Sequence, residues 1–222
     1  TQPMKLAASE ALWETSGDPA PWTVIAGIDP EGKQNTWTVQ VPYLLSYLAY
    51  GKFSGDLPGM NDLQAQYEQQ FGPGNYIPPV RTTFWSFRIM IFAGLLMILL
   101  ALYGGYLAVR KRLDQAKQWF LQAMVWAIFL PHIANASGWV MTEVGRQPWT
   151  VFGLLRTEDS ISPGVSAPEV LISLIAYTAI FSAATAAMVY LFVRVIKKGP
   201  EETAETADVT ETDAKLTIQP ST

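Results

Sequence analysis

Residues 89–109 (IMIFAGLLMILLALYGGYLAV) decide the fold, because they run without a single charged side chain. A helix rises about 1.5 Å per residue, so about 20 apolar residues cross the hydrocarbon core of a bilayer. Two more stretches, 118–142 and 170–193, are also long and uncharged. The sequence therefore predicts an all-α, polytopic bundle with three transmembrane helices, at about residues 84–109, 118–143 and 169–194.

The composition agrees with a membrane protein. Half of the residues are hydrophobic and 15% are charged, whereas roughly 25% are charged in soluble domains. The chain has no cysteine, which excludes disulfides, iron–sulfur clusters and thiolate-bound haem within it. Because His132 is its one histidine, the chain cannot form a polyhistidine metal site. We expect no nucleic-acid partner.

Basic residues border the predicted spans on one side of the membrane. Four lie between the first two spans and three follow the third: Arg110, Lys111, Arg112, Lys117, Arg194, Lys197 and Lys198. Because basic loops stay in the cytoplasm, residues 1–83 and the 145–169 connection should lie outside the cell. Residues 200–222 are acidic and rich in threonine, which predicts a disordered cytoplasmic tail.

Residues 1–83 are polar, rich in glycine and proline, and contain no apolar run long enough to span a bilayer. We expect an extracytoplasmic loop domain here, with a short helix at 5–14, a strand at 37–41 and an amphipathic surface helix at 43–50. Three tryptophans of this segment are candidate anchors at the lipid headgroups: Trp13, Trp22 and Trp37.

The second predicted span carries unusual residues on one stripe. At 100° per residue, Trp139, Glu143 and Arg146 lie within about 40° of His132. Pro131 removes a backbone hydrogen bond and predicts a kink. An ionised side chain costs about 2.5–3.5 kcal/mol at the centre of a bilayer helix, so Glu143 and Arg146 indicate either a functional site or a mutual ion pair. We expect His132 to hydrogen-bond a neighbouring helix; a haem contact or a proton path are the alternatives.

Three motifs follow one another along the chain. The first is QPMKLAASEALW at residues 2–13, and the second is FRIM at residues 87–90. The third is EVGRQPW at residues 143–149, with Gly138-Trp139 before it and GLLRT after it at 153–157. Together they resemble, in the same order, the quinol-binding loop, the haem-ligating methionine segment and the signature of the larger, haem-bearing subunit of cytochrome bd-type quinol oxidases. The resemblance covers residues 1 to about 198.

The resemblance implies the C-terminal half of a subunit that oxidises membrane quinol and reduces dioxygen to water, with low-spin haem b, high-spin haem b and haem d. Met90 would be an axial ligand of the low-spin haem b through its thioether. Arg88 would pair with a haem propionate or, as an interfacial residue, reach the headgroups. Glu143 would serve a haem iron of the oxygen site, with Trp139 between the haem planes and Arg146 compensating propionate charge.

Lys5 and Glu10 match the family's quinol-loop pair. Quinol oxidation releases two protons, so Glu10 would accept a proton while Lys5 holds the quinol oxygen. The implied partners are the N-terminal half of the subunit with its histidine ligands, a second membrane subunit, quinol, dioxygen and the lipid of a bacterial or archaeal cell membrane. We expect this chain alone to be inactive.

A rival interpretation belongs to another class of protein. The chain would be part of a non-enzymatic membrane scaffold or transporter, in which Glu143 and Arg146 only pair with each other.

Overall fold

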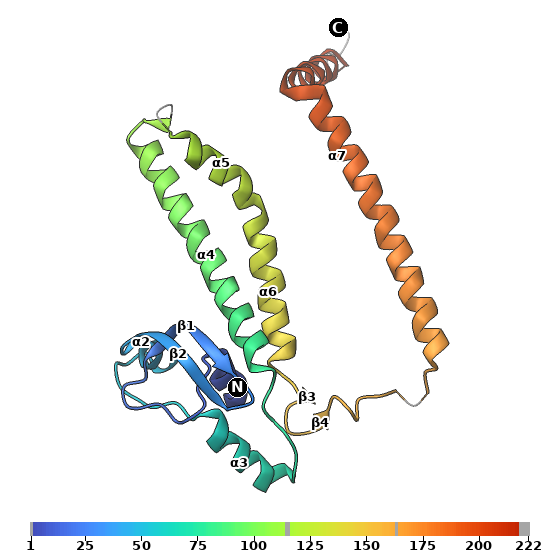
Figure 1. The fold of residues 1–222 in the computed structure, drawn as a ribbon. Coiled ribbons are helices and arrows are strands. Elements are labelled where there is room, and N and C mark those ends of the chain that lie inside the picture. The colour runs from blue at the N-terminus through green and yellow to red at the C-terminus, as the bar shows by residue number, and fades with distance from the viewer. Residues whose placement is uncertain (1, 114–115, 163, 218–222) are drawn as a thin grey trace. The chain divides into compact units, whose positions relative to one another are not determined.

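The computed structural model describes residues 2–113, 116–162 and 164–217 (Figure 1). The chain divides into two compact units, Thr1–Ile161 and Ser162–Thr222. The first unit begins with α1 (Pro3–Ser9), β1 (Trp22–Asp29), β2 (Gln34–Val41), α2 (Leu44–Tyr50), α3 (Met60–Phe71) and α4 (Val80–Val109). It continues with α5 (Gln118–Trp126), the 3₁₀ turn η2 (Ala127–Phe129), α6 (Leu130–Val144), β3 (Trp149–Val151) and β4 (Leu155–Arg156). The second unit contains α7 (Ala167–Thr217).

Three helical stretches of the described chain are long and apolar enough to cross a membrane: Val80–Val109, Gln118–Val144 and Ala167–Lys198. They confirm the three predicted spans. Within the first unit, α4 and α6 pack side by side (Figure 1). The rest of their surface is largely exposed in this chain, as expected of helices that face lipid or further protein.

The chain is mostly helical, but the all-α prediction is wrong in detail. Two small antiparallel sheets are present, β1 with β2 and β3 with β4. In the larger sheet the pairs run from Trp22 opposite Val41 to Asp29 opposite Gln34. Both strands are rich in threonine, valine and tryptophan, which favour the extended backbone. The alternating pattern at 37–41 predicted part of the second strand.

The second span is interrupted, as Pro131 predicted. α5 ends at Trp126, η2 forms one 3₁₀ turn, and α6 begins at Leu130 with Pro131 in its first turn. Proline has no backbone N–H to donate, and its fixed φ suits the first turn of a helix. Figure 1 shows that the span bends between α5 and α6.

The N-terminal segment, residues 2–79, packs on the first turns of α4. Its apolar core includes side chains of α1 and α3 together with Val80 and Phe84 of α4. α1 is shorter than the helix predicted at 5–14, because Ala11 adopts a left-handed φ of 51° that ends it. α1 therefore stops at the point where its last turn reaches α4.

Aromatic side chains fix β3 and β4 to the N-terminal segment. Trp149 stacks on Tyr76 with ring centroids 5.7 Å apart and meets Phe71 edge-on at 4.9 Å. The Arg156 guanidinium lies 5.0 Å from the centroid of Tyr76 and donates a hydrogen bond to its hydroxyl. The chain that follows α6 is therefore held against the end of α3.

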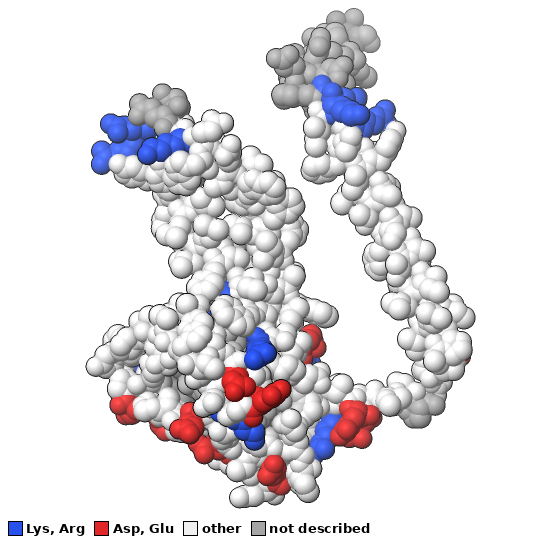
Figure 2. Space-filling model, in the orientation of Figure 1, with Lys and Arg blue, Asp and Glu red and all other residues white. Residues whose placement is uncertain are grey.

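Charged side chains of the first unit gather toward the two ends of α4 (Figure 2). Basic side chains gather at the connection from α4 to α5, whereas acidic and basic side chains lie together on and beside the N-terminal segment.

In the second unit, α7 differs from the predicted disordered tail at 200–222. Its backbone is helical to Thr217, and residues 218–222 lie outside the described residues. From Ala167 to Lys198 every side chain is exposed in this chain.

Candidate functional site

A buried arginine joins α4 to the N-terminal segment. The Arg88 side chain is fully buried, and its Nη2 donates a hydrogen bond to Glu10 Oε2 at 2.6 Å, which forms an ion pair. Arg88 Nε donates to the Thr23 carbonyl at 2.9 Å, and Nη2 donates to the same oxygen. One guanidinium therefore connects α4 to the end of α1 and to β1.

Aromatic rings enclose this guanidinium. Its central carbon lies 4.4 Å from the ring centroid of Phe84, 5.0 Å from that of Trp22 and 5.1 Å from that of Phe87. Arg88 therefore does not reach the headgroups, and that alternative from the sequence is wrong. Arg88 Nη1 is buried without a hydrogen-bond partner among the described residues, so one donor is left for an acceptor from outside this chain.

Glu10 is suited to exchange a proton near neutral pH. Burial raises the pKa of Glu10 to about 7, because the loss of water around the carboxylate outweighs the attraction of Arg88. A general base works best when its pKa lies near the operating pH.

Lys5 extends from the same helix toward the end of α6. Its Nζ donates a hydrogen bond to the Thr142 carbonyl at 3.4 Å. Partial burial, followed by the positive charge of Arg146, lowers the pKa of Lys5, and the charge of Glu143 opposes that shift. Lys5 and Glu10 are therefore held by different partners and do not pair with each other.

Lys5 and Glu10 line one cavity of about 850 Å³. Its other walls are mainly apolar and come from α1, α2, α4 and the end of α6; they include Leu6, Leu44, Leu48, Phe87, Ile91 and Met141. Sites for small ligands typically measure about 300–1,000 Å³ and combine apolar walls with a few polar groups. The cavity combines two ionisable side chains with largely apolar walls, as such sites do.

Some of these walls carry no signal in the sequence. The pattern at 43–50 predicted a surface helix, but only the folded chain shows that Leu44 and Leu48 face the same cavity as Lys5. The Thr23 carbonyl that binds Arg88 also escaped notice, because every residue has a backbone oxygen. The sequence pattern thus predicted the helix, whereas the residues that share the cavity became apparent only from tertiary contacts.

Met90 lies against α6 at Gly138. A Cβ atom on Gly138 would stand 2.8 Å from Met90 Sδ, so the glycine makes room for the thioether. Met90 is half-buried and comes two residues after Arg88 on α4. At 100° per residue the two side chains leave the helix on opposite sides.

The structure pairs Glu143 with Arg146. Arg146 Nη2 donates to Glu143 Oε1 at 2.6 Å, and the two side chains are 33% and 43% exposed for Arg146 and Glu143, respectively. This pair is one of the two alternatives from the sequence, and a spacing of three residues favours it on a helix. Trp139 and His132 are exposed on α6. The hydrogen bond expected from His132 to a neighbouring helix is not found within the described residues.

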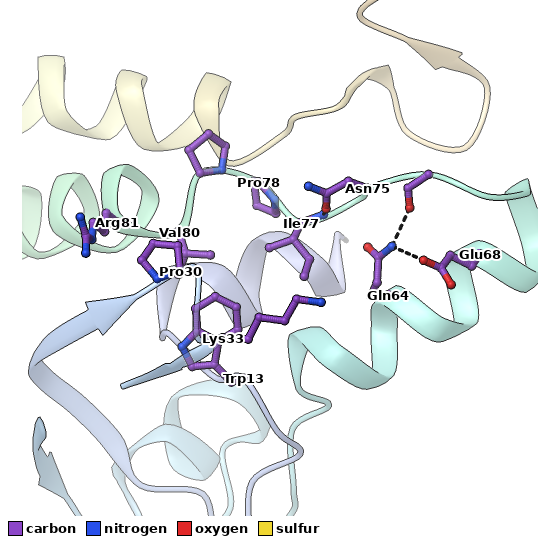
Figure 3. A pocket seen from close by; sticks show the side chains of 12 residues that line it. Trp13, Pro30, Lys33, Gln64, Glu68, Asn75, Ile77, Pro78, Val80 and Arg81 are labelled. Carbon is purple, nitrogen blue, oxygen red and sulfur yellow. Dashed lines mark hydrogen bonds between the residues drawn. The ribbon is translucent and has the colours of Figure 1, made fainter. Parts of the chain in front are cut away.

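A second cavity, of about 720 Å³, lies beside the turn between β1 and β2. Figure 3 shows Lys33 among its walls and the Gln64 amide bound to Glu68 and to the Gly74 carbonyl. None of the site residues predicted from the sequence lines it. The candidate chemistry is therefore concentrated at the first cavity and at the end of α6.

Known proteins resemble this chain over most of its length. The family described as cytochrome bd terminal oxidase subunit I matches residues 1–200. Cytochrome bd ubiquinol oxidase subunit 1 of Bacillus subtilis (strain 168) is 55% identical over 201 residues, which cover 90% of this chain and 43% of that protein. Cytochrome bd-II ubiquinol oxidase subunit 1 of Escherichia coli (strain K12) is 29% identical over 255 residues, covering 90% and 49%.

A solved structure has a similar fold. The bd oxidase from Geobacillus thermodenitrificans matches with a TM-score of 0.68 and 28% identity, over 90% of this chain and 43% of that chain. This chain spans less than half of the length of the relatives just named.

We predict that Glu10 makes stability depend on pH. The folded protein holds the Glu10 proton up to about pH 7, whereas the unfolded chain releases it near pH 4.5. The stability from this group is thus complete below pH 4.5 and is lost as the pH rises through about 7. Thermal unfolding midpoints of the assembled protein, measured across this range, should fall with pH, and Glu10→Gln should remove that part of the fall.

Glu14→Gln is the matched control, because Glu14 is exposed on the same segment. It should keep the pH dependence of the unmodified protein. An unchanged pH dependence in Glu10→Gln would contradict the assignment.

Proposed function

The chain belongs to the cytochrome bd terminal oxidase subunit I family, and on that basis we propose that it supplies the quinol site and haem ligands of a respiratory oxidase that reduces dioxygen to water. The observation that carries the proposal is the cavity shared by Lys5 and Glu10. Glu10 is bound there to Arg88, which lies on the same turn of α4 as Met90. Through Arg88, α4 holds the proposed proton acceptor Glu10, and the same helix carries the proposed haem ligand Met90.

Quinol oxidation in this cavity requires the removal of two electrons and two protons. Lys5, held at the end of α6, would donate a hydrogen bond to one quinol oxygen, and Glu10 would accept the proton of a hydroxyl group. Arg88 keeps the Glu10 carboxylate at the cavity wall while burial keeps its proton affinity high enough to accept. The leucines of α2 would cover the apolar tail.

Met90 would hold the low-spin haem b through its thioether, together with a histidine from the N-terminal half of the subunit. When bound, this haem would supply a one-electron acceptor for quinol oxidation. Arg88 Nη1 is buried and without a hydrogen-bond partner among the described residues, so it would be the donor for a propionate that reaches the side of α4 opposite Met90. Gly138 leaves space for the Met90 sulfur, because a Cβ atom at residue 138 would stand 2.8 Å from Sδ. This close packing restricts the position of the thioether, as a ligand role would require.

Glu143 would serve the oxygen site formed by high-spin haem b and haem d. The end of α6 places it beside Arg146, which would compensate propionate charge, and leaves Trp139 exposed toward a partner. The ion pair of Glu143 with Arg146 supports the rival, purely structural role equally well, so this assignment depends on its test.

The complete oxidase would contain the N-terminal half of this subunit and a second membrane subunit. The basic connection between α4 and α5 would face the cytoplasm, with residues 1–83 outside and residues 200–222 inside. The quinol cavity would then lie at the outer surface of a bacterial or archaeal cell membrane. The chain alone would be inactive, because the histidine ligands and part of the dioxygen site would come from the N-terminal half of the subunit.

The quinol role predicts a selective loss of activity. In the complete oxidase, Glu10→Gln and Lys5→Ala should each lower quinol oxidation by about 10²-fold or more, the scale of general acid–base catalysis. Oxygen uptake with a small artificial electron donor, and the haem spectra, should stay near normal. The control Glu14→Gln should leave both rates unchanged. Equal loss with both donors would show that α1 is only structural.

The haem role of Met90 predicts a spectroscopic change. Met90→Leu keeps a similar volume but removes the sulfur, so the low-spin signal in reduced-minus-oxidised spectra should disappear or change to high spin. Gly138→Ala should perturb the same signal, because its Cβ displaces the thioether. Gly94→Ala on α4 is the control, since a Cβ there meets nothing within 4 Å. A normal low-spin spectrum in Met90→Leu would refute the ligand.

Glu143 separates catalysis from simple pairing. If its carboxylate serves the oxygen site, Glu143→Gln should abolish most oxygen uptake and disturb the high-spin haem signals, while the Met90-linked haem stays reducible. If it only pairs with Arg146, the change should cost about 0–1 kcal/mol of stability and little activity, as for exposed ion pairs. Glu158→Gln is the control, because Glu158 is an exposed partner of Arg156. Normal turnover with full haem content would exclude the catalytic role.

A further inference from the structure

The helix α2 presents an aromatic and apolar patch to its surroundings. The patch consists of Tyr43, Tyr47, Leu48, Tyr50 and Phe53, each between 47% and 66% exposed. Tyr47 stacks on Phe53 with ring centroids 5.0 Å apart. The opposite side of α2 is buried through Leu45 and Ser46. Large exposed apolar patches mark surfaces that meet a partner or a membrane.

The cavity that α2 lines indicates the level of α2 relative to the apolar span of α4. Leu44 and Leu48 share the 850 Å³ cavity with Phe87 and Ile91 of α4. The uncharged stretch of α4 begins at Ile89, so Ile91 lies within the part of the helix that faces hydrocarbon. α2 therefore lies beside α4 at the level where the apolar span begins.

The charge pattern agrees with a position at the membrane surface. Residues 34–50, which include β2 and α2, contain no charged side chain. In Figure 2 the part of the surface where α2 lies, on the left of the view, is uncharged, and acidic side chains appear toward the lower edge. Tyrosine and tryptophan rings are enriched at the level of the lipid headgroups because they combine an apolar ring with a polar group.

The tryptophans give a useful contrast. Trp13 is buried in the core and Trp22 packs on Arg88, so these two predicted anchors are wrong. Trp37 on β2, the third predicted anchor, is 52% exposed, and its role stays a prediction. The tyrosines of α2 fit a headgroup surface by exposure, composition and depth.

We propose that α2 lies on the bilayer, with its aromatic patch among the lipid headgroups on the side of the membrane that carries the N-terminal segment. The occupant of the patch is lipid and not a protein chain. Leu48 and Tyr50 of the patch also line the cavity, so the test of this inference uses Tyr47 and Phe53, which do not line it.

A spin-label experiment on the complete oxidase tests the proposal. Tyr47→Cys and Phe53→Cys, neither of which lines the cavity, would each carry a nitroxide in nanodiscs of phosphatidylcholine and phosphatidylglycerol. Collisions with oxygen, which concentrates in lipid, are compared with collisions with a water-soluble nickel chelate. The parent complex, which lacks the introduced cysteines, is treated with the same spin label and gives the background signal.

Glu31→Cys is the control position. Glu31 is exposed at the turn between β1 and β2, near Arg81, which donates a hydrogen bond to the Ile28 carbonyl. Arg81 precedes Ile91 by ten residues of α4, which is about 15 Å along the helix axis. A label at Glu31 should therefore sit in water.

The expected result is an oxygen-to-nickel ratio several-fold higher at positions 47 and 53 than at 31. Ratios equal to the control would place α2 in water and overturn the proposal. Exclusion of both reagents from 47 and 53 would show that a protein covers the patch, which would also overturn it. Haem spectra of the labelled complexes confirm that the comparison is made on assembled oxidase.

Discussion

The buried ion pair between Arg88 and Glu10 is the constraint on which the first unit depends. Removing both charges from water is unfavourable, and it is offset only if the geometry is good and the remaining donors are satisfied. The Thr23 carbonyl accepts from two nitrogens of Arg88, and aromatic rings cover the guanidinium. Loss of Arg88 would leave the Glu10 carboxylate without its cation and the Thr23 carbonyl without its donors, at a cost of roughly 3–5 kcal/mol. The positions of α1, β1 and α4 are thus mutually dependent.

Local properties of the sequence explain the elements that were predicted. Uncharged apolar runs are sufficient to locate the spans, since crossing a bilayer requires length and composition alone. Pro131 has no backbone N–H to donate, so its effect on the helix is local and does not depend on tertiary contacts. The helix predicted at 5–14 was too long, because Ala11 adopts a left-handed backbone conformation that ends it. The amino-acid composition of the segment does not reveal this conformation.

The candidate site could be predicted as a set of residues but not as an arrangement. Lys5 and Glu10 were expected to act together, yet each is held by a partner far along the chain. Arg88 lies 78 residues from Glu10, and Thr142 lies 137 residues from Lys5. No spacing rule connects positions so distant, and burial, which raises the pKa of Glu10, is itself a product of the tertiary fold. The pair of Glu143 and Arg146, only three residues apart, could be anticipated for that reason.

The stacking of Trp149 on Tyr76 has a consequence for biogenesis. The core of the N-terminal segment includes Trp149, and Lys5 needs the backbone of Thr142. A ribosome that synthesises the chain in order completes residues 2–79 long before either contact exists. Native contacts between distant positions form late. The segment must therefore wait, incompletely packed, until two spans have entered the bilayer and the β3–β4 hairpin has emerged on the same side. Membrane insertion of α4 and α6 is thus a step in the folding of the segment that precedes them.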